Sequence, residues 1–564
     1  MHRSTYDVIV VGAGFAGLAT GVRAAELGLR VAVLEKGTTP DYLCNSRISG
    51  GVFHVAHEDV TKPAETILAA IEHTTQGNAD PRLARALAEE VGPAMAWLGG
   101  LGGKFIRSGA QARHTLMAAP PRPLGDMLDW MTSWQGRGPD QLIRLLAQRL
   151  AEFGGVLLLG HRAQSLVMEN GACVGVDVVV GGENQRLTAQ AVVVADGGFQ
   201  ADTELLRQHI SPAPQSIRQR NAQTGTRDGL RMAEAAGAAL TPMEGFYGHV
   251  LSRDAMENAL LWPYPLLDDL ATAGIVVDNQ GNRFCDEGNG GVAIANGIAA
   301  QSDPLATTVI CDAVIWERSS HKPHVSAPNP KLQQLGGTIH VAETIEALAK
   351  LAGLPEATLR AAVDKHNTAC ATGDFTAITP ARTATRREPL PITTGPFYAL
   401  PACAGITFTM GGIKIDEKAR VLDTQGKPIV GLYAAGSSTG GLEGGPSVAY
   451  VSGLSKAATF GKVAAETIAA RLDKPTTPEA LPALAKGRPH PALDLLVKNG
   501  DWLALVIGLA PVAGGVGLAA ATSGIGMQLA LVVGGILIGA LGGLMFRSYV
   551  ELIHVIMDTL LPQE

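Results

Sequence analysis

The chain has 564 residues, a formal net charge of −7 at pH 7 and 17% charged residues. This length allows two to four domains of ~100–200 residues each, and the mild negative charge argues against nucleic-acid binding, which needs basic patches. No two of its six cysteines lie at C-x-x-C spacing, which argues against a zinc ribbon, an iron–sulfur cluster or c-type haem. Cysteines without a pattern are typical of a reducing compartment.

The N-terminal segment "YDVIVVGAGFAGLATGVRAAELGLRVAVLEKG" has the pattern of a dinucleotide-binding unit. An apolar strand over 8–11 precedes a glycine-rich turn, a helix over 15–27 follows, and a second strand over 30–34 ends beside Glu35. Periodicity and the glycine-rich turn together predict a βαβ unit. The first strand begins by Tyr6, so no signal peptide is expected before it.

The glycine-rich turn has the order G-x-G-x-x-G. Gly12 permits the tight turn, Gly14 lets a pyrophosphate approach the helix N-terminus, and Gly17 allows the helix to pack closely on the strand. Glu35 can accept hydrogen bonds from ribose hydroxyls. The unit predicts a bound dinucleotide, but by itself it fits FAD as well as NAD.

Later segments add two more glycine-rich strand ends, several predicted helices and a predicted linker. The strand ends are "VVVADGGF" (192–199) and "PIVGLYAAGSSTGGLEGG" (428–445), and with the first turn they could line one extended ligand. Helices are predicted over 139–153 and, as a pair joined by Gly353 and Pro355, within 344–370. The Pro-rich stretch 474–491 is predicted to be a linker.

Taken in this order, these segments resemble the flavoprotein family of fumarate reductase and succinate dehydrogenase, which also includes 3-ketosteroid dehydrogenases and tricarballylate dehydrogenase. The resemblance covers about residues 5–470 and includes "CNSRISGGVF" (44–53), "TGTRDGLRMAEAAGA" (224–238), "GIVVDNQGNRFCDE" (274–287) and "FTMGGIKID" (408–416). It implies an α/β fold: a Rossmann-like FAD-binding domain in two parts, 1–243 and 404–472, with an α+β capping domain inserted at 244–403. It also implies hydride transfer between flavin N5 and a substrate carbon, in making or reducing a C=C bond.

The resemblance also implies which residues contact the FAD. Some family members attach FAD covalently through a His before the Gly-Gly loop, but "YLCNSRI" has none, so non-covalent FAD is expected. Cys44 could form a thioether, but a packed thiol is the preferred interpretation. The expected cofactor-binding residues are Gly12, Gly14, Gly17, Glu35, Lys36, Asn45, Ser46, Ser49, Gly50, Gly51, Ala163, Asp196, Gly197, Asp228, Gly411, Gly436 and Ser437.

Three positions that bind a dicarboxylate in the family are changed here. Gly290 and Gly291 stand where the resemblance implies Thr and the proton-donating Arg, Phe408 replaces a His, and the loop 443–453 has no Arg. A small dianion would lose charge-assisted hydrogen bonds of roughly 1.5–3 kcal/mol each. Fumarate and succinate are therefore not expected to be substrates.

Other side chains are candidates for the chemistry. His249 falls close to a substrate-binding His of the family and could move a proton near neutral pH. Tyr450 lies in the loop expected to pass near the flavin, and steroid dehydrogenases of the family use tyrosines as acid and base. Arg253 is a third candidate, with a surface ion pair to Asp254 or Glu257 as the alternative.

Three aromatic residues of the same stretch are open to two interpretations. Tyr247, Trp262 and Tyr264 could form the wall of a substrate pocket. Isolated aromatics of this kind are more often core residues. No metal ligands are expected.

The C-terminal region has no charged residue or His from Trp502 to Phe546. The segments 502–521 and 525–546 each have ~20 residues, which as helices span about 30 Å, one bilayer core. A transmembrane helical hairpin at 500–546, after a linker at 473–499, is the preferred interpretation, and a buried soluble hairpin is the alternative.

The residues that flank the hairpin predict its orientation. The flanking cations Lys486, Arg488, Lys498 and Arg547 lie on the enzyme's side, which predicts an inner-membrane protein with its enzyme domain on the cytoplasmic side. Residues 547–564, with Glu551, His554 and Asp558 on one face, are predicted to be an interfacial amphipathic tail.

The sequence thus predicts a membrane-anchored FAD oxidoreductase that acts on the CH–CH bond of a small molecule. A quinone or a redox protein would be its electron partner, and no nucleic acid is expected. One alternative is a soluble flavoprotein whose tail mediates oligomerisation. Another is a non-catalytic flavin-binding membrane protein.

Overall fold

A computed structural model describes residues 6–107, 111–120, 134–320, 327–383, 388–474 and 509–560. These residues fall into two compact units, one within 1–103 and 107–478 and the other within 104–106 and 479–564. The cysteines of the described chain, all six of them, are free thiols.

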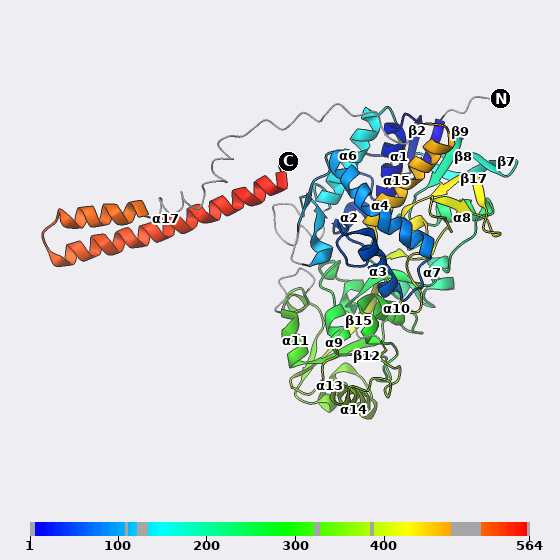
Figure 1. Ribbon diagram of the computed structural model, residues 1–564. Helices are drawn as coiled ribbons and strands as arrows, with labels where there is room; N and C mark the ends of the chain where they lie inside the picture. Colours follow the sequence, from blue (N-terminus) through cyan, green and yellow to red (C-terminus); the bar gives the residue numbers. More distant parts are fainter. Residues whose placement is uncertain are drawn as a thin grey trace. The chain divides into compact units, whose positions relative to one another are not determined.

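The larger unit contains an eight-stranded sheet, whose strands lie in the upper part of Figure 1. Its central strands run parallel and are almost fully buried, which fits the apolar runs of the sequence because helices cover both faces of such sheets. Parallel strands place their carboxyl ends at one edge, so the ends of β1, β9 and β17 lie together as expected. The order is β16 (Arg420–Leu422), β17 (Pro428–Ala434), β9 (Glu183–Val194), β1 (Tyr6–Val11), β2 (Val31–Glu35) and β6 (Val156–Leu159), with β7 (Arg162–Glu169) and β8 (Ala172–Val180) continuing from β9.

Helix α1 (Phe15–Glu26) is packed unusually closely on its neighbours. A Cβ on Gly17 would lie 1.9 Å from the carbonyl oxygen of Gly12, and one on Gly461 of α15 (Leu454–Arg471) would lie 2.7 Å from that of Ala16. Glycine is therefore needed at both contacts, and the predicted packing role of Gly17 is confirmed. Further helices of this part are α2 (Asn45–Ile48), α3 (Ala64–Thr75), α4 (Pro81–Gly100), α6 (Gly138–Glu152), α7 (Thr203–His209) and α8 (Asp228–Ala235).

A second, six-stranded sheet lies mostly within the predicted capping region, 244–403. Strand β15 (Phe397–Thr409) is its centre and pairs with β10 (Arg218–Gln219), β11 (Phe246–Ser252), β13 (Thr307–Asp312) and β14 (His340–Ala342), while β12 (Ile275–Val277) pairs with β13. Pairing of β15 with β11 continues to Phe408 and Thr409, so the strand runs through the domain boundary expected at 403/404. A short sheet of β3 (Val52–Phe53) and β5 (Leu116–Ala118) lies in the FAD-binding part.

The helices of the capping region agree with the sequence pattern. The pair expected within 344–370 is α13 (Ile345–Ala352) and α14 (Glu356–Thr372), and Gly353 ends the first in a left-handed conformation with φ +68°. Glycine adopts this conformation without strain, as helix C-termini commonly require. The other helices are α9 (Asp268–Ala273), α10 (Gly291–Ala299), α11 (Ala313–Ser320) and α12 (Lys331–Gln334).

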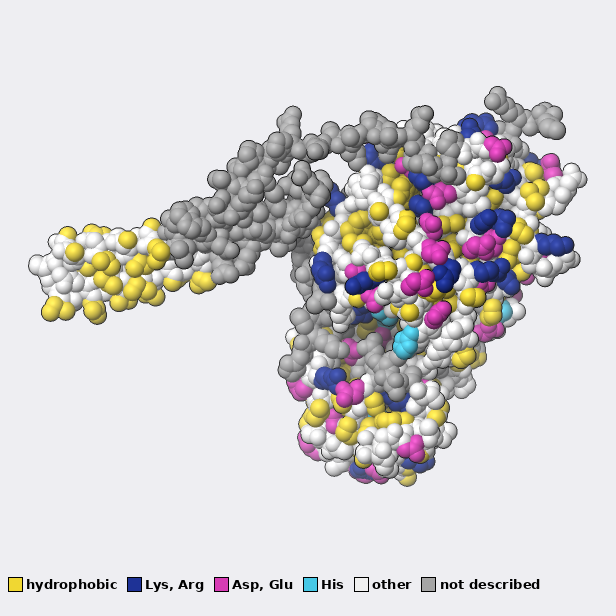
Figure 2. Space-filling model, viewed as in Figure 1, with side chains coloured by type: hydrophobic (Ala, Val, Ile, Leu, Met, Phe, Trp, Pro, Cys, Tyr) yellow, Lys and Arg dark blue, Asp and Glu magenta, His cyan; other side chains and the backbone are white. Residues whose placement is uncertain are grey.

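The C-terminal unit contains an apolar helix over Leu509–Ala520 and the long helix α17 (Ile525–Leu560). The two helices touch at glycines: a Cβ on Gly515 would lie 2.6 Å from the carbonyl oxygen of Leu531, and one on Gly535 would lie 2.6 Å from that of Pro511. Such small faces allow helix backbones to approach closely. Figure 2 shows apolar side chains and no charged ones along the coloured part of these helices, whereas the larger unit's face mixes both charges.

Only one helix of the described chain is long and apolar enough to cross a membrane, Met527–Met545, with a mean hydropathy of 2.0. The preceding helix is described only from Leu509, so the first predicted span lies partly outside the described residues, as do the cations at 486, 488 and 498. Helix α17 also continues without interruption past Phe546. The predicted interfacial tail is therefore not a separate helix.

Candidate functional site

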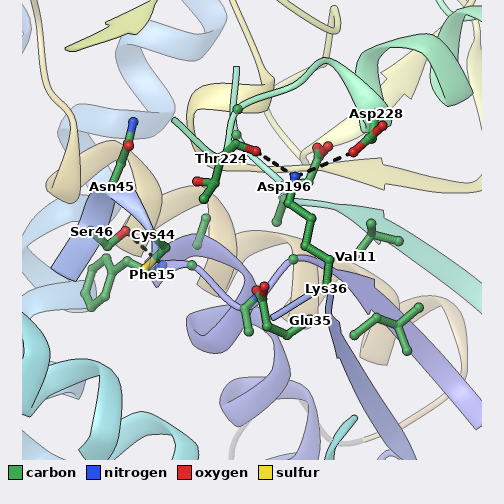
Figure 3. A pocket seen from close by; sticks show the side chains of 18 of the residues that line it. Val11, Phe15, Glu35, Lys36, Cys44, Asn45, Ser46, Asp196, Thr224 and Asp228 are labelled. Atoms are coloured by element: carbon green, nitrogen blue, oxygen red, sulfur yellow. Dashed lines mark hydrogen bonds and ion pairs between the residues drawn. The ribbon is translucent and has the colours of Figure 1, made fainter. Parts of the chain in front are cut away.

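A pocket opens where the parallel strands end, at the carboxyl edge of the eight-stranded sheet (Figure 3). About 830 Å³ of space, part of it open to solvent, lies between the glycine-rich turn, the segment 43–46 and the segment 195–200. Ligands of open α/β sheets bind at this edge, outside the carboxyl ends of the strands. The pocket also exposes the N-terminus of α1, whose backbone N–H groups and dipole favour a phosphate.

Ten of the predicted cofactor-binding residues line this pocket. They are Gly12, Gly14, Glu35, Lys36, Asn45, Ser46, Ala163, Asp196, Gly197 and Asp228. Residues that the sequence did not single out also line it, among them Phe15, His161, Arg162, Gln200, Thr224 and Ala457. Phe15 and Thr224 lie within segments that the sequence marks, whereas His161, Arg162, Gln200 and Ala457 lie in no such segment and reach the pocket only in the folded chain.

The other seven predicted cofactor residues are not among those that line the pocket, and some of them pack closely on its surroundings. A Cβ on Gly411 would lie 2.2 Å from the carbonyl oxygen of Pro242, and one on Gly436 would lie 2.7 Å from Cβ of Ala16. These glycines therefore shape the wall by close packing. Contact of FAD with Gly17, Ser49, Gly50, Gly51, Gly411, Gly436 and Ser437 stays a prediction.

Glu35 is fixed by the backbone of the turn that it faces. Its Oε2 accepts a hydrogen bond from the N–H of Ala13 at 3.2 Å and its Oε1 from that of Gly37 at 2.7 Å. A carboxylate has about four acceptor positions, so two remain for ribose hydroxyls. Contact of Glu35 with ribose hydroxyls stays a prediction, which these free acceptor positions allow.

Lys36 and Asp228 close the far side of the pocket. Lys36 Nζ donates to the carbonyl oxygen of Thr224 at 2.8 Å and lies 3.6 Å from Asp228 Oδ2 (Figure 3). Burial favours the neutral carboxyl, but hydrogen bonding from Thr226 and the charges of Lys36 and Arg162 outweigh burial and lower the pKa of Asp228. Asp228 therefore stays ionised, and an acceptor faces the ligand there.

Asp196 is the opposite case. Burial raises its pKa to about 6, although the N–H of Gly229 donates to its Oδ2 at 2.6 Å. The hydroxyl of Ser438 donates to Oδ1 at 3.2 Å and accepts from the N–H of Gly197 at 2.9 Å. The third glycine-rich strand end therefore reaches the pocket through Ser438, which sequence reasoning missed.

The thiol of Cys44 borders the pocket but is buried. Burial raises its pKa to about 11, and the thiolate is the reactive form. The residue therefore suits a packed thiol better than a covalent link to flavin.

A cluster of aromatic and polar side chains lies between β11, β15 and the loop after β17. The rings of Tyr247 and Tyr450 stack with centroids 3.9 Å apart, and Phe408 lies 5.3 Å from Tyr247. His249 Nε2 is 3.1 Å from the Tyr247 hydroxyl, and its Nδ1 is 2.6 Å from Asp268 Oδ2. The structure thus brings together His249 and Tyr450, two separate candidates of the sequence, and adds Asp268, which no motif marked.

Two histidines complete the cluster on the side of the FAD-binding part. The rings of His54 and His57 stack 5.0 Å apart, and His54 meets Tyr450 edge to face at 5.5 Å. The neighbouring Phe53 packs on Phe15, which lines the pocket. The two sites are therefore joined through packed side chains.

A hydrogen bond also joins the cluster to the pocket. Asn45, on the pocket wall, donates from Nδ2 to the carbonyl oxygen of Thr407 at 3.1 Å. Thr407 directly precedes Phe408 in β15. The wall of the pocket is thus in direct contact with the strand that carries Phe408, a member of the cluster.

The loop 443–453 is held by a buried ion pair rather than by an arginine. Lys456 Nζ lies 2.6 Å from Glu443 Oε2, with side-chain exposures of 2% and 0%. The N–H of Ser452 donates to the other carboxylate oxygen at 3.0 Å. The positive charge of Lys456, which contacts this loop, is therefore already neutralised by Glu443.

Arg253 does not belong to the cluster. It is exposed beyond the end of β11 and donates to the carbonyl oxygen of Leu305 at 3.3 Å. Asp254, the expected alternative partner, instead accepts hydrogen bonds from Thr338. No group of three or more potential metal ligands occurs in the described ranges.

Trp262 and Tyr264 contact the strands beside the cluster. Trp262 Nε1 donates to the carbonyl oxygen of Gln219 at 2.8 Å, and the Arg220 guanidinium lies 5.2 Å from the Tyr264 ring. Arg220 also donates to Thr407 Oγ1 at 3.1 Å. Arg220 therefore supplies a cation beside the cluster.

Comparison with known proteins agrees with this geometry. The model of the FAD binding domain family matches residues 7–447, well over half of the chain. The probable fumarate reductase Ifc3 of Shewanella frigidimarina is 29% identical over 83% of this chain and 76% of its own length, and the urocanate reductase of Eggerthella lenta is 28% identical over 82% and 74%. A solved structure of 3-ketosteroid-Δ4-(5α)-dehydrogenase from Rhodococcus jostii RHA1 shares the fold, with a TM-score of 0.62 and 21% identity over 83% of this chain and 98% of that one.

The pocket, its position at the carboxyl edge of the sheet and the family match lead to the same conclusion. The predicted resemblance and the expected cofactor are confirmed. The chain belongs to the FAD binding domain family and is an FAD-dependent oxidoreductase.

Proposed function

We propose that the protein forms or reduces a carbon–carbon double bond in a small molecule that is neither fumarate nor succinate. FAD bound in the pocket, without a covalent link, would exchange a hydride with one substrate carbon. The chain's own cluster around His249 and Tyr450 would face the substrate and handle the proton. The relatives named fumarate reductase and urocanate reductase support this class of reaction.

The hydrogen bond from Asn45 to Thr407 is the observation that carries the proposal. It ties the wall of the FAD pocket to the strand that carries Phe408, whose ring packs on Tyr247. Titratable hydroxyl and imidazole groups thus lie next to the place that a flavin ring would reach. Such groups, within hydrogen-bond reach of a substrate, are the usual acids and bases of catalysis.

The charges of the cluster argue against a small dicarboxylate. Phe408 is apolar, Gly291 has no side chain, and Lys456 is paired with Glu443. Arg220 supplies a cation beside Thr407. A neutral or singly charged unsaturated compound therefore fits this cluster better than a dianion, which would need several charge-assisted hydrogen bonds.

Anaerobic titration of the purified holoprotein tests the proposal. Photoreduced protein is mixed with unsaturated ketones and unsaturated monocarboxylic acids, and oxidised protein with their saturated counterparts, while flavin absorbance is followed. We expect at least one pair to change the flavin's redox state and fumarate and succinate to leave it unchanged. Rapid reoxidation by fumarate would contradict the proposed specificity, and no response to any compound would favour a non-catalytic flavin-binding protein.

We further propose that the C-terminal unit anchors the enzyme to the inner membrane as a two-span hairpin, with the flavin domain in the cytoplasm. The length and apolar surface of Met527–Met545 support one span, and the glycine contact of Gly515 with Gly535 supports a paired second helix. An anchor would bring the flavin to a quinone or a membrane redox protein. The soluble alternative, a tail that mediates oligomerisation, predicts the same helices without a bilayer.

A chain ending at Leu472 separates these alternatives. Every residue lining the pocket lies at or before Ala457, and α15 ends at Arg471. We expect the shortened protein to be soluble and to keep its FAD, while the full chain stays in carbonate-washed membranes. Recovery of the full chain in the soluble fraction as an oligomer that the shortened chain does not form would support the alternative.

A further inference from the structure

Three side chains of the capping region form a continuous hydrogen-bonded chain. Asp268, the first residue of α9, is 2.6 Å from His249 Nδ1, and His249 Nε2 is 3.1 Å from the Tyr247 hydroxyl. His249 and Tyr247 are two residues apart in β11, so their side chains leave the same face of the strand. The chain ends at the ring of Tyr247, which stacks on Tyr450.

A backbone contact of Asp268 determines the direction of the hydrogen bonds among Asp268, His249 and Tyr247. The N–H of Val250 donates to Asp268 Oδ1 at 2.8 Å, which leaves Oδ2 to face the imidazole. A carboxylate oxygen can only accept, so the proton of His249 must sit on Nδ1. In the neutral imidazole Nε2 is then an acceptor, and the Tyr247 hydroxyl donates to it. This is the arrangement by which Asp orients His in a Ser-His-Asp triad, with a phenol in the place of the serine.

Gly291 is what makes room for this chain. A Cβ at this position would lie 2.1 Å from Asp268 Cγ and 2.4 Å from its Oδ2. Any side chain at 291 would therefore push the carboxylate away from His249. The absent arginine and the Asp268–His249 contact exclude each other in this fold.

We infer that Tyr247 is the proton donor and acceptor for the substrate carbon, and that Asp268 and His249 are positioning residues that load it. This inference rests on the proposed function. When a double bond is reduced, the O–H bond of Tyr247 breaks and its proton bonds to the carbon that does not receive the hydride. The phenolate then regains a proton from solvent through His249 Nε2. FAD, when bound in the pocket, would supply the two electrons with the hydride, and in dehydrogenation Tyr247 would accept the proton along the same path.

The environment of Tyr247 keeps its hydroxyl protonated at neutral pH. Burial raises the pKa of Tyr247 to about 12 and, with Tyr247 and Glu443 nearby, raises that of Tyr450 well above its usual value. Charged and titratable groups that act on Tyr247 are Arg113, Arg220, Tyr264, Asp268, His249 and Tyr450. Because both phenols hold their protons, a step that consumes a proton, the reduction of a double bond, starts from the resting state.

Substitution of Asp268 by Asn tests the inference without a substrate. The Val250 N–H holds the amide oxygen, so the amide NH2 would face His249 and donate to Nδ1. The imidazole must then carry its proton on Nε2 and can no longer accept from Tyr247. We expect nitrogen NMR of ¹⁵N-histidine-labelled holoprotein, above the pH at which the ring is charged, to show this tautomer switch, with FAD content unchanged. The His249→Gln spectrum identifies the signal.

Two further variants give the controls. Asp269→Asn changes the adjacent carboxyl of α9 and should keep the Nδ1–H form, whereas Gly291→Ala should disturb His249 as Asp268→Asn does. An unchanged tautomer in Asp268→Asn, or the same switch in Asp269→Asn, would overturn the inference. These outcomes do not depend on any substrate, so they are distinct from a failure of the proposed function, which would show as a flavin that no compound oxidises or reduces.

Discussion

The FAD pocket lies next to the cluster of Tyr247, His249, Asp268 and Tyr450, here called the Tyr247 cluster. The two differ in how strongly local sequence determines them. The pocket is built from strand ends, each of which is followed at once by its own functional residues, such as Gly12 and Gly14 after β1 and Asp196 after β9. The cluster is built from β11, α9, α10, β15 and a loop, and its residues meet only in the folded chain. A cofactor site can thus follow a family pattern while the proposed substrate site beside it departs from that pattern.

The largest effect should come from Gly14→Val, which acts on the pocket alone. Only Ser46 Oγ lies within 4 Å of a Cβ built on Gly14, at 3.8 Å, so the protein itself leaves room and the branched side chain would meet the pyrophosphate. We expect folded protein with almost no FAD, measured as flavin released by acid per chain. Gly99→Val, at a position with no atom within 4 Å of a Cβ, should keep its FAD. Full FAD content in Gly14→Val would show that the pyrophosphate lies elsewhere.

Next in size is Tyr247→Phe, which acts on the cluster alone. It removes the hydroxyl and keeps the ring stacked on Tyr450, so we expect normal FAD content and a loss of about 10²–10⁴-fold in the rate of flavin reoxidation by the substrate. Single-turnover absorbance measurements would determine this rate. Tyr398→Phe is the matched control, because the Tyr398 ring stacks on Trp316 instead. A rate within a few-fold of the original would assign proton transfer to Tyr450 or another group.

A smaller effect is expected from Asp196→Asn, which tests the buried carboxyl of the pocket by its pH dependence. A carboxyl whose folded pKa of about 6 exceeds its unfolded value of 3.8 binds its proton more tightly when folded. It therefore stabilises the fold at low pH, and this contribution is lost as the pH rises from about 4 to 6. Between those limits the original protein should lose up to about 3 kcal/mol relative to Asp196→Asn, seen in melting temperatures of the FAD-free forms. Parallel pH profiles would contradict the raised pKa.

The smallest effect is expected from Arg253→Ala. Arg253 is exposed and its hydrogen bond goes to the backbone of Leu305, so flavin content and reoxidation rate should stay within about two-fold of the original, as for most surface changes. A larger loss of rate with FAD retained would restore Arg253 as a substrate-binding residue and weaken the division between pocket and cluster.

Much of the fold could be predicted from the sequence because its signals are local. The βαβ unit, the helix pair α13 and α14 and the glycine-rich strand ends follow from periodicity and turn residues within short windows. Lining of the pocket by His161 or Gln200 could not be predicted, because these residues reach it only through the order of strands in the sheet. The role of Ser438 depends in the same way on the pairing of β17 with β9.

Even fewer residues of the Tyr247 cluster could be predicted from local sequence. His249 and Tyr450 were predicted from their places in family segments, whereas Asp268 lies 19 residues beyond His249 at a helix start with no motif around it. Gly291 was predicted only as a missing arginine, and its positive role, leaving space for Asp268, depends on a contact between α9 and α10. Arg253 was singled out by nearness in sequence, but the chain turns away after β11 and takes it from the cluster.

The central claim is that this flavoprotein acts on a carbon–carbon bond through the Tyr247 cluster and not through a dicarboxylate clamp. The most direct measurement is anaerobic stopped-flow absorbance of the photoreduced holoprotein, mixed in turn with fumarate and with a panel of neutral and singly charged unsaturated ketones and acids. We expect reoxidation by a member of the panel, slowed at least about tenfold in Asp268→Asn, and no comparable reaction with fumarate. Fast reoxidation by fumarate, equal in the original protein and in Asp268→Asn, would contradict it.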